Sequence, residues 1–236
     1  MGSRPLLFGA CSLFILLILA RVGTSEEAPD IYFAASTDGG LTWTDPNVRV
    51  DDSGWGYQAF PSLGVDSVGN LYAAWMDNRV GDAIYSSMST DGGANWTQNI
   101  RVDDTMGGER WYPSLASYSV ENVFPVWSDT RDGPYHIYFT KSTDGGQNWL
   151  SPNVRVNDMA PAERYRPSLC VGEDGILYAC WVDTQGGIFF ARSTDAGMSW
   201  TDPNVRASDS TQVNHPSINV DAIGNVYIAW QKGLWD

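Results

Sequence analysis

The sequence has few basic residues. Its 236 residues include 14 lysines and arginines against 28 aspartates and glutamates, which gives a formal net charge of -14. A protein that binds nucleic acid through the phosphate backbone needs clustered lysine and arginine. The composition therefore argues against a nucleic-acid partner. The acidic surface indicates solubility and names no partner by itself.

Cysteine is also scarce, with three in the chain. Cys11 lies in an apolar N-terminal segment, whereas Cys170 and Cys180 lie on two segments joined by the short turn 172–175. Facing positions on paired strands bring Cβ atoms close enough for a disulfide, and an exported chain meets oxidising conditions. We predict a Cys170–Cys180 disulfide, and the alternative is a pair of buried thiols.

Long apolar runs are missing from all but the N-terminus. There, Arg4 precedes an apolar run from Leu6 to Ala20, and small residues follow up to Ser25. This pattern predicts a secretory signal peptide over residues 1–25, with an uncleaved anchor as the alternative. We expect a secreted or otherwise extracytoplasmic protein, periplasmic or on the cell surface, with no further membrane contact.

Helical periodicity is absent after the N-terminus, and a repeat of short β-rich segments takes its place. In one repeat the segments cover residues 112–117, 122–129, 136–142 and 149–156, and we name them A, B, C and D. Each is bounded by glycine, aspartate, asparagine or proline, which is typical of strands. Four antiparallel strands in about 50 residues are the size of one propeller blade.

The order of these segments predicts an all-β fold, a β-propeller of four-stranded antiparallel blades over residues 30–236. The chain begins with a C-D half blade (30–51), continues with full blades at 58–103, 112–157 and 166–207, and finishes with an A-B half blade (215–232). This is about four blades' worth of sequence. The two half blades can close a four-bladed ring, or the chain can be part of a larger ring.

One motif occupies all four C-to-D turns. Ser-Thr-Asp-(Gly/Ala)-Gly-x-x-Trp begins at residues 36, 89, 142 and 193. It resembles the Asp-box, or bacterial neuraminidase repeat, of the sialidase superfamily. Propellers of that family usually have six blades, which favours a truncated six-bladed propeller and a partial protein.

The family resemblance also implies that these boxes are structural and lie away from the active site. We expect each aspartate to accept N–H bonds within its turn, each second glycine to take positive φ, and each tryptophan to be buried. The residues concerned are Asp38, Gly40, Trp43, Asp91, Gly93, Trp96, Asp144, Gly146, Trp149, Asp195, Gly197 and Trp200.

Strand alternation places the Asp-boxes on one face and the B-to-C and D-to-A loops on the opposite one, which we call the front face. Acids, arginines and aromatics collect in the front loops. Residues that repeat in register are expected to be scaffold, so the better ligand candidates are those that break register. Arg166 and His215 do so, since the same place holds Phe60 and Tyr112 in other repeats. All the ligand-binding candidates are Arg166, Arg79, Arg131, Arg110, Arg164, His215, Trp55 and Trp111.

Sialidases of this family hold a sugar carboxylate with three arginines and use a tyrosine nucleophile paired with a glutamate. The resemblance therefore offers Tyr165 with Glu163, and Tyr112 with Glu109, as catalytic candidates. The family's early Arg-Ile-Pro segment has no match here. Several charged neighbours also repeat in register, which favours structural ion pairs over ligand contacts for Glu109-Arg110, Glu163-Arg164, Asp77/Arg79 and Asp129/Arg131.

Three functions stay open. The regular loops favour a secreted propeller, non-catalytic or incomplete as it stands, that recognises a glycan or an extracellular protein through its front face. The second is an exo-α-sialidase-type glycoside hydrolase acting on terminal sialic acids. The third is a structural domain of a larger surface protein. We expect no cofactor and no metal, and a monomeric chain.

Overall fold

The computed structural model describes residues 29–158 and 162–233, so the expected signal peptide and Cys11 lie outside it. Within these residues the chain forms strands and turns. No helix of the described residues is long and apolar enough to cross a membrane.

Three of the sheets are four-stranded and antiparallel, and each has its strands in chain order. We call them blades 1, 2 and 3. Blade 1 contains β3 (Gln58–Val65), β4 (Leu71–Asp77), β5 (Ala83–Ser89) and β6 (Ile100–Arg101). Blade 2 contains β7 (Arg110–Tyr118), β8 (Asn122–Asp129), β9 (His136–Phe139) and β10 (Val154–Arg155). Blade 3 contains β11 (Arg164–Val171), β12 (Leu177–Asp183), β13 (Gly187–Ser193) and β14 (Val205–Arg206).

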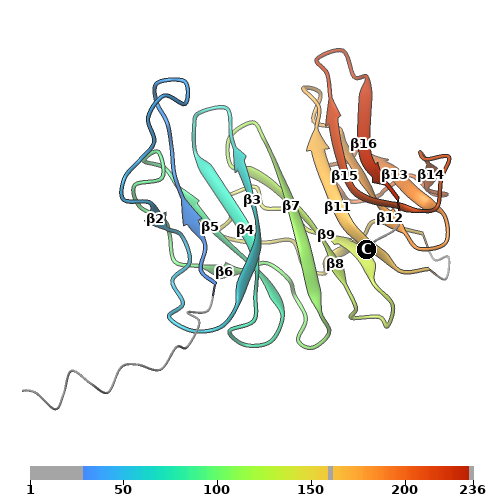
Figure 1. Ribbon diagram of the computed structural model, residues 1–236, viewed down its shortest axis with the longest axis horizontal. Helices are drawn as coiled ribbons and strands as arrows, with labels where there is room; N and C mark the ends of the chain where they lie inside the picture. Colours follow the sequence, from blue (N-terminus) through green and yellow to red (C-terminus); the bar gives the residue numbers. More distant parts are fainter. Residues whose placement is uncertain (1–28, 159–161, 234–236) are drawn as a thin grey trace, which may run out of the picture.

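Two smaller sheets stand at the ends of the row of blades. One contains β1 (Tyr32–Phe33) and β2 (Val48–Arg49), and the other β15 (Val213–Val220) and β16 (Val226–Lys232). Figure 1 shows an open arc with these two sheets at opposite ends. The two half blades therefore do not join to close a four-bladed ring.

The core consists of apolar layers between successive sheets. One tryptophan on the second strand of each full blade, Trp75, Trp127 and Trp181, is completely buried. Blade 1 packs on blade 2 through Leu115, and blade 2 packs on blade 3 through Leu169. Every blade buries one face against each neighbouring sheet, and the first strands of successive sheets pack on one another. Among the described residues no earlier first strand packs on β3, so apolar side chains such as Leu63 stay exposed there.

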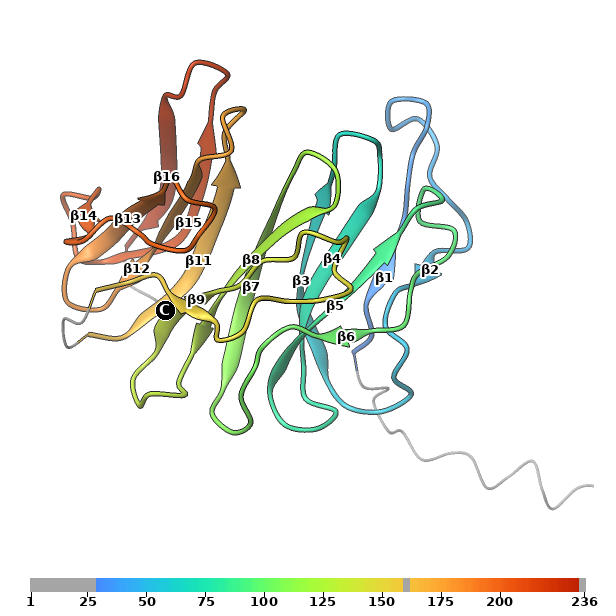
Figure 2. The same cartoon turned by 180° about the vertical axis from the view of Figure 1, so that it is seen from behind.

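The first strands of the sheets lie next to one another, as Figure 2 shows for β3, β7, β11 and β15. The serine of each repeated Pro-Ser pair links them. Ser62 accepts the N–H of Leu115 at 2.9 Å, and Ser114 accepts that of Leu169 at 3.0 Å. Each such bond contributes about 1 kcal/mol to stability. The repeats therefore fix how neighbouring blades are aligned.

The repeated turn motif behaves as the sequence predicts for its aspartates and glycines. Asp144 accepts bonds from the Ser142 hydroxyl at 2.7 Å and from the backbone N–H of Asn148 at 2.9 Å. The equivalent glycines all have positive φ, for example 85° at Gly146. For Trp43 the prediction of burial is wrong, since its side chain is 62% exposed. Trp96 instead packs on Phe33 of the preceding sheet, and no such sheet precedes Trp43 in the described residues.

The predicted Cys170–Cys180 disulfide is wrong, because both residues are free thiols. The hairpin register explains this. Cys170 faces Tyr178, and Cys180 faces Ser168, so the two cysteines are diagonal neighbours rather than facing residues. Diagonal pairs lie too far apart for a disulfide without backbone movement. Both thiols instead fill space in the apolar layer between blade 3 and the β15–β16 sheet.

Candidate functional site

Each first strand contains a bulge at the place where register-breaking residues were found. The pairing shifts at this point, between Tyr165 and Ser168 on β11 for example. The bulged residue precedes a proline and has positive φ: 56° at Phe60, 56° at Tyr112, 55° at Arg166 and 46° at His215. Such values are uncommon for residues other than glycine, and residues held this way cluster at functional sites.

These four bulged residues form a continuous row across the arc. The Phe60 and Tyr112 ring centres are 4.6 Å apart, and the Arg166 guanidinium lies 4.9 Å from the Tyr112 ring centre. Arg166 is also hydrogen-bonded to the His215 ring. Together with the prolines that follow them, the four residues line a cavity of about 410 Å³.

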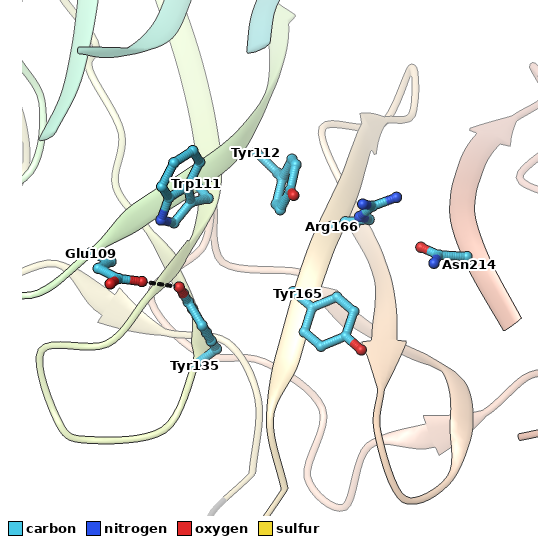
Figure 3. Close-up of a pocket in the computed structure, with 7 residues that line it drawn as sticks. All are labelled: Glu109, Trp111, Tyr112, Tyr135, Tyr165, Arg166 and Asn214. Carbon is cyan, nitrogen blue, oxygen red and sulfur yellow. Dashed lines mark hydrogen bonds between the residues drawn. The ribbon is translucent and has the colours of Figure 1, made fainter. Parts of the chain in front are cut away.

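A second cavity of about 410 Å³ adjoins the first and shares Tyr112 and Arg166 with it. Figure 3 shows the side chains that line it. They come from the start of β7 and the residue before it, the start of β11, β15 and the loop before β9. We call this cavity the front pocket, and its lining is Glu109, Trp111, Tyr112, Tyr135, Tyr165, Arg166 and Asn214.

One polar pair stands out in the front pocket. The Tyr135 hydroxyl donates a hydrogen bond to the Glu109 carboxylate (Figure 3). Burial, and then this hydrogen bond, raise the pKa of Tyr135 well above its ordinary value. Tyr135 therefore stays protonated at neutral pH unless a group takes its proton, and Glu109 is placed to accept it. The expected partner of Glu109 was Tyr112, which is turned instead toward Phe60 and Arg166.

Several carboxylates influence the front pocket. Burial and the Glu109 charge raise the pKa of Asp82, which immediately precedes β5, whereas Arg110 opposes this shift. Burial and the Glu163 charge raise the pKa of Tyr165, whereas Arg166 opposes this shift. Glu163 and Arg166 therefore act on the same side chain, that of Tyr165, whereas Asp82 lies beside Glu109 and Arg110.

Two of the arginine candidates are held by aspartates of neighbouring loops. Arg79 bonds Asp77 at 2.7 Å and Asp52 at 2.5 Å, and its guanidinium lies 4.4 Å from the Tyr85 ring centre. Arg131 repeats this arrangement with Asp129 and Asp104 and lies 4.2 Å from the Tyr138 ring centre. Both therefore clamp one blade to the next and lie outside the lining of the front pocket.

The other two arginine candidates are buried, which excludes direct ligand contact. Arg110 is 0% exposed, and its Nε lies 3.0 Å from Asp103 and 3.2 Å from Asp129. Its NH1 and NH2 groups donate to backbone carbonyls, including that of Gly107 at 2.8 Å. Arg164 is 2% exposed and pairs with Asp158 and Asp183. The sequence had left ion pairs with the adjacent glutamates open, but the partners are aspartates.

The remaining candidates divide between the two cavities and the loops. Glu109, Trp111, Tyr112, Tyr165 and Arg166 line the front pocket, and His215 lines the adjoining cavity. Trp55 is 64% exposed on the loop before β3, and Glu163 lies just before β11, outside the front-pocket lining. Among the described residues no group of histidine, cysteine, aspartate and glutamate could hold a metal ion.

Sequence reasoning missed two residues of the front pocket, Tyr135 and Asn214. A signal for Tyr135 was available. By strand register it occupies the place of Asp82 in blade 1 and Gly186 in blade 3, so it breaks register as Arg166 does. Asn214 is harder to find, because it is one of several asparagines in the strand-rich repeats and nothing local marks its side chain as a pocket residue.

The chain matches no family model. It is 25% identical over 217 residues to a sialidase of Bacteroides fragilis (strain YCH46), an alignment that covers 75% of this chain and 38% of that protein. The chain thus spans well under half the length of this relative. The sequence similarity is therefore to a sialidase.

Solved structures show the same fold. The chain resembles a Hadza microbial sialidase with a TM-score of 0.61 and 17% identity, over 85% of this chain and 46% of that one. It resembles an α-L-arabinofuranosidase from Fusarium graminearum with a TM-score of 0.62 and 18% identity, over 87% of this chain and 68% of that one. At the level of fold, the chain is a sialidase-like β-propeller, and this fold is shared by proteins with different sugar substrates.

Proposed function

We propose that this chain is the carbohydrate-recognising part of a sialidase-like propeller and that the front pocket binds the sugar. One observation carries the proposal: aromatic side chains and hydrogen-bonding groups line the same cavity. Trp111, Tyr112, Tyr135 and Tyr165 supply the aromatic surface, and Glu109, Arg166 and Asn214 supply the polar atoms. Sugars present apolar C–H faces that pack on aromatic rings and hydroxyls that need directed hydrogen bonds.

The size and position of the front pocket support this proposal. Its volume of about 410 Å³ falls within the range of small-molecule sites. It lies where two blades and the β15–β16 sheet meet, so residues distant in sequence reach the same ligand. Tyr112 and Arg166 are held at bulges with positive φ, which fixes the direction of their side chains. A pre-organised pocket of this kind loses little entropy when it binds a sugar.

Binding without turnover is the form of the proposal that the arginines favour. A sialidase-like site holds the substrate carboxylate with three arginines, whereas the front-pocket lining contains Arg166 alone among the described arginines. Arg79 and Arg131 are bound by aspartates, and Arg110 is buried with two more. The chain therefore offers a sugar pocket without an arginine triad in its described residues.

Sugar binding can be measured by isothermal titration calorimetry and saturation-transfer NMR with lactose, arabinobiose and 3′-sialyllactose. We expect at least one of them to bind. Trp111→Ala should weaken binding about tenfold, since aromatic packing contributes on the order of 1 kcal/mol beyond the buried area. Trp43→Ala is the matched control, because Trp43 is exposed on a C-to-D turn. Equal effects of the two variants, or no binding at all, would remove the proposal.

A second candidate function is hydrolysis by an exo-α-sialidase-type mechanism, and the Tyr135–Glu109 hydrogen bond favours it. In such a mechanism the glutamate takes the tyrosine proton, the phenolate oxygen attacks the anomeric carbon, and the glycosidic C–O bond breaks as the departing aglycone oxygen takes a proton from water. Fluorogenic sialosides and arabinofuranosides test for turnover. If turnover occurs, Tyr135→Phe should abolish it and leave ligand binding within about threefold, because only one hydroxyl is lost. Tyr165→Phe is the matched control, and a larger loss there would assign the nucleophile to Tyr165.

We also propose that the protein is exported, on the basis of the leader pattern in residues 1–25. Expression of the full chain in a bacterial host tests this. The N-terminal sequence and mass of the protein recovered outside the cytoplasm should place the mature N-terminus between residues 21 and 26. Recovery of the intact chain in the cytoplasm alone would contradict the proposal.

A further inference from the structure

We infer that the front pocket selects neutral sugars and disfavours sugars that carry a carboxylate. This inference rests on the proposed function and narrows its ligand class. It follows from the charges that surround the front pocket. A ligand carboxylate is repelled by each pocket carboxylate that no nearby cation neutralises.

The lining itself contains one acid and one base, Glu109 and Arg166. A further carboxylate acts on this region, because the charge of Glu163 raises the pKa of both Tyr135 and Tyr165, which line the pocket. Two carboxylates, Glu109 and Glu163, thus oppose the one guanidinium of the lining. Like charges in a partly desolvated site repel more strongly than in bulk water. An anionic sugar would enter against this repulsion, and a neutral sugar would not.

The orientation of Arg166 adds to this preference. A guanidinium binds a carboxylate best when it presents two parallel N–H groups to it. One terminal nitrogen of Arg166 is hydrogen-bonded to the His215 ring, and the guanidinium is stacked over Tyr112. A carboxylate that approaches the edge held by His215 would have to compete with the ring for an N–H group. A sugar hydroxyl needs only one donor and can bind while these contacts persist.

Four further arginine candidates on this face are already balanced by aspartates. Arg79 and Arg131 each contact two aspartates, and the same is true of the buried Arg110 and Arg164. Their charges are compensated within the scaffold. The chain as a whole has a formal net charge of -14, so its long-range field also repels anions.

The groups that remain suit hydroxyls. Glu109 offers carboxylate oxygens as acceptors, Asn214 offers an amide that both donates and accepts, and Tyr165 offers a phenol. Such a set recognises the vicinal hydroxyls of a neutral sugar ring and contains no second cation for a carboxylate. The front pocket therefore suits a neutral glycan, although the chain has a sialidase-like fold.

The decisive experiment compares ligands of one shape and two charges. The methyl glycoside of N-acetylneuraminic acid and its methyl ester form one pair, and methyl galacturonoside and methyl galactoside form another. Calorimetry on the full chain at low salt should give at least tenfold tighter binding of the neutral member. Raising the salt concentration to about 0.5 M should narrow the difference, because salt screens the repulsion.

Removal of one pocket carboxylate gives a second readout. Glu109→Gln should reduce the discrimination between the two members of each pair by severalfold. Glu173→Gln is the matched control, since Glu173 is exposed on the opposite face, in the β11–β12 turn. Equal or tighter binding of the anionic member by the wild-type chain would overturn the inference and leave sugar binding intact. Binding of neither member nor of any neutral glycan would instead remove the proposed function, and the inference with it.

Discussion

The guanidinium of Arg166 lies 4.9 Å from the ring centre of Tyr112, and the two residues occupy the same repeat position on adjacent inner strands. Both are held at bulges with positive φ, which directs their side chains toward each other across the boundary between blades 2 and 3. The stacking keeps the cation extended over an aromatic face, where both cavities of the front face share it.

Substitution of Arg166 tests whether this residue contributes to binding. Arg166→Ala should weaken sugar binding about tenfold, because it removes a hydrogen-bond donor and a cation–π contact that contributes about 1 kcal/mol. Arg166→Lys should recover only part of the loss, since lysine lacks the planar fork. Calorimetry measures both. Arg192→Ala is the control, because Arg192 is exposed on β13, outside the lining of both cavities.

Substitution of Arg110 should instead affect stability. Its guanidinium is buried between Asp103 and Asp129, so Arg110→Ala leaves two buried carboxylates without their shared partner. Breaking a buried pair in this way costs about 3–5 kcal/mol of unfolding free energy. Urea denaturation followed by tryptophan fluorescence measures the change. The Arg192→Ala variant should stay within about 0.5 kcal/mol of wild type. A similar small effect at Arg110 would show that the two aspartates are satisfied without it.

The cysteines should behave as inert thiols. Burial raises the pKa of Cys170 to about 11 and that of Cys180 to about 12, so neither forms much thiolate near neutral pH. In the folded protein both should react slowly with a thiol reagent, and both should react rapidly in denaturant. Reducing agent should leave the thermal midpoint unchanged. A shift of the midpoint by reducing agent, or fewer than two reactive thiols in the unfolded mature chain, would indicate a disulfide instead.

The blades could be predicted from sequence because a propeller repeats its physical constraints. Every blade needs a buried tryptophan on its second strand and a tight C-to-D turn, so Trp75 and Asp144 have counterparts at a fixed period. The repeat also singled out Arg166 and His215 as ligand candidates. Each differs from its counterparts in other repeats, so the repeated scaffold does not require it. The disulfide prediction failed because it depended on register within one hairpin. A bulge and a turn set that register, and the repeat does not reveal it.

The front pocket was predictable only in part for a related reason. Glu109 and Tyr135 are neighbours because the loop before β7 and the loop before β9 converge, and their separation in sequence gives no sign of this. Arg110 looked like a ligand residue because the sequence places it on the correct face. Only the packing of the two loops shows that its side chain turns inward to the aspartates. Face and strand can therefore be read from the repeat, whereas side-chain direction cannot.

His136 predicts how stability depends on pH. It is 5% exposed at the start of β9, and its Nδ1 faces the side chains of Arg155 and Asn157. Burial first, and then the charges of Arg155 and Arg164, lower the pKa of His136 to about 4, against an ordinary value of 6.5. Between these two pH values the unfolded chain binds a proton at this site that the folded chain does not bind. Unfolding free energy should therefore fall as pH drops from about 6.5 to about 4, by on the order of 2 kcal/mol.

Urea denaturation at a series of pH values checks this, and the variant His136→Gln isolates the effect. Glutamine keeps an acceptor for Arg155 and cannot titrate, so the variant should lose less stability than wild type between pH 6.5 and 4. His215→Gln is the control, because His215 is exposed and this variant retains His136. Carboxylates such as Asp91 affect stability in a separate, lower pH range. Hydrogen bonds that Asn95 donates lower the pKa of Asp91 to about 2. Their contribution is lost only as pH falls from about 4 toward 2. Identical slopes for wild type and His136→Gln above pH 4 would show that His136 protonates as easily in the folded chain as in the unfolded one.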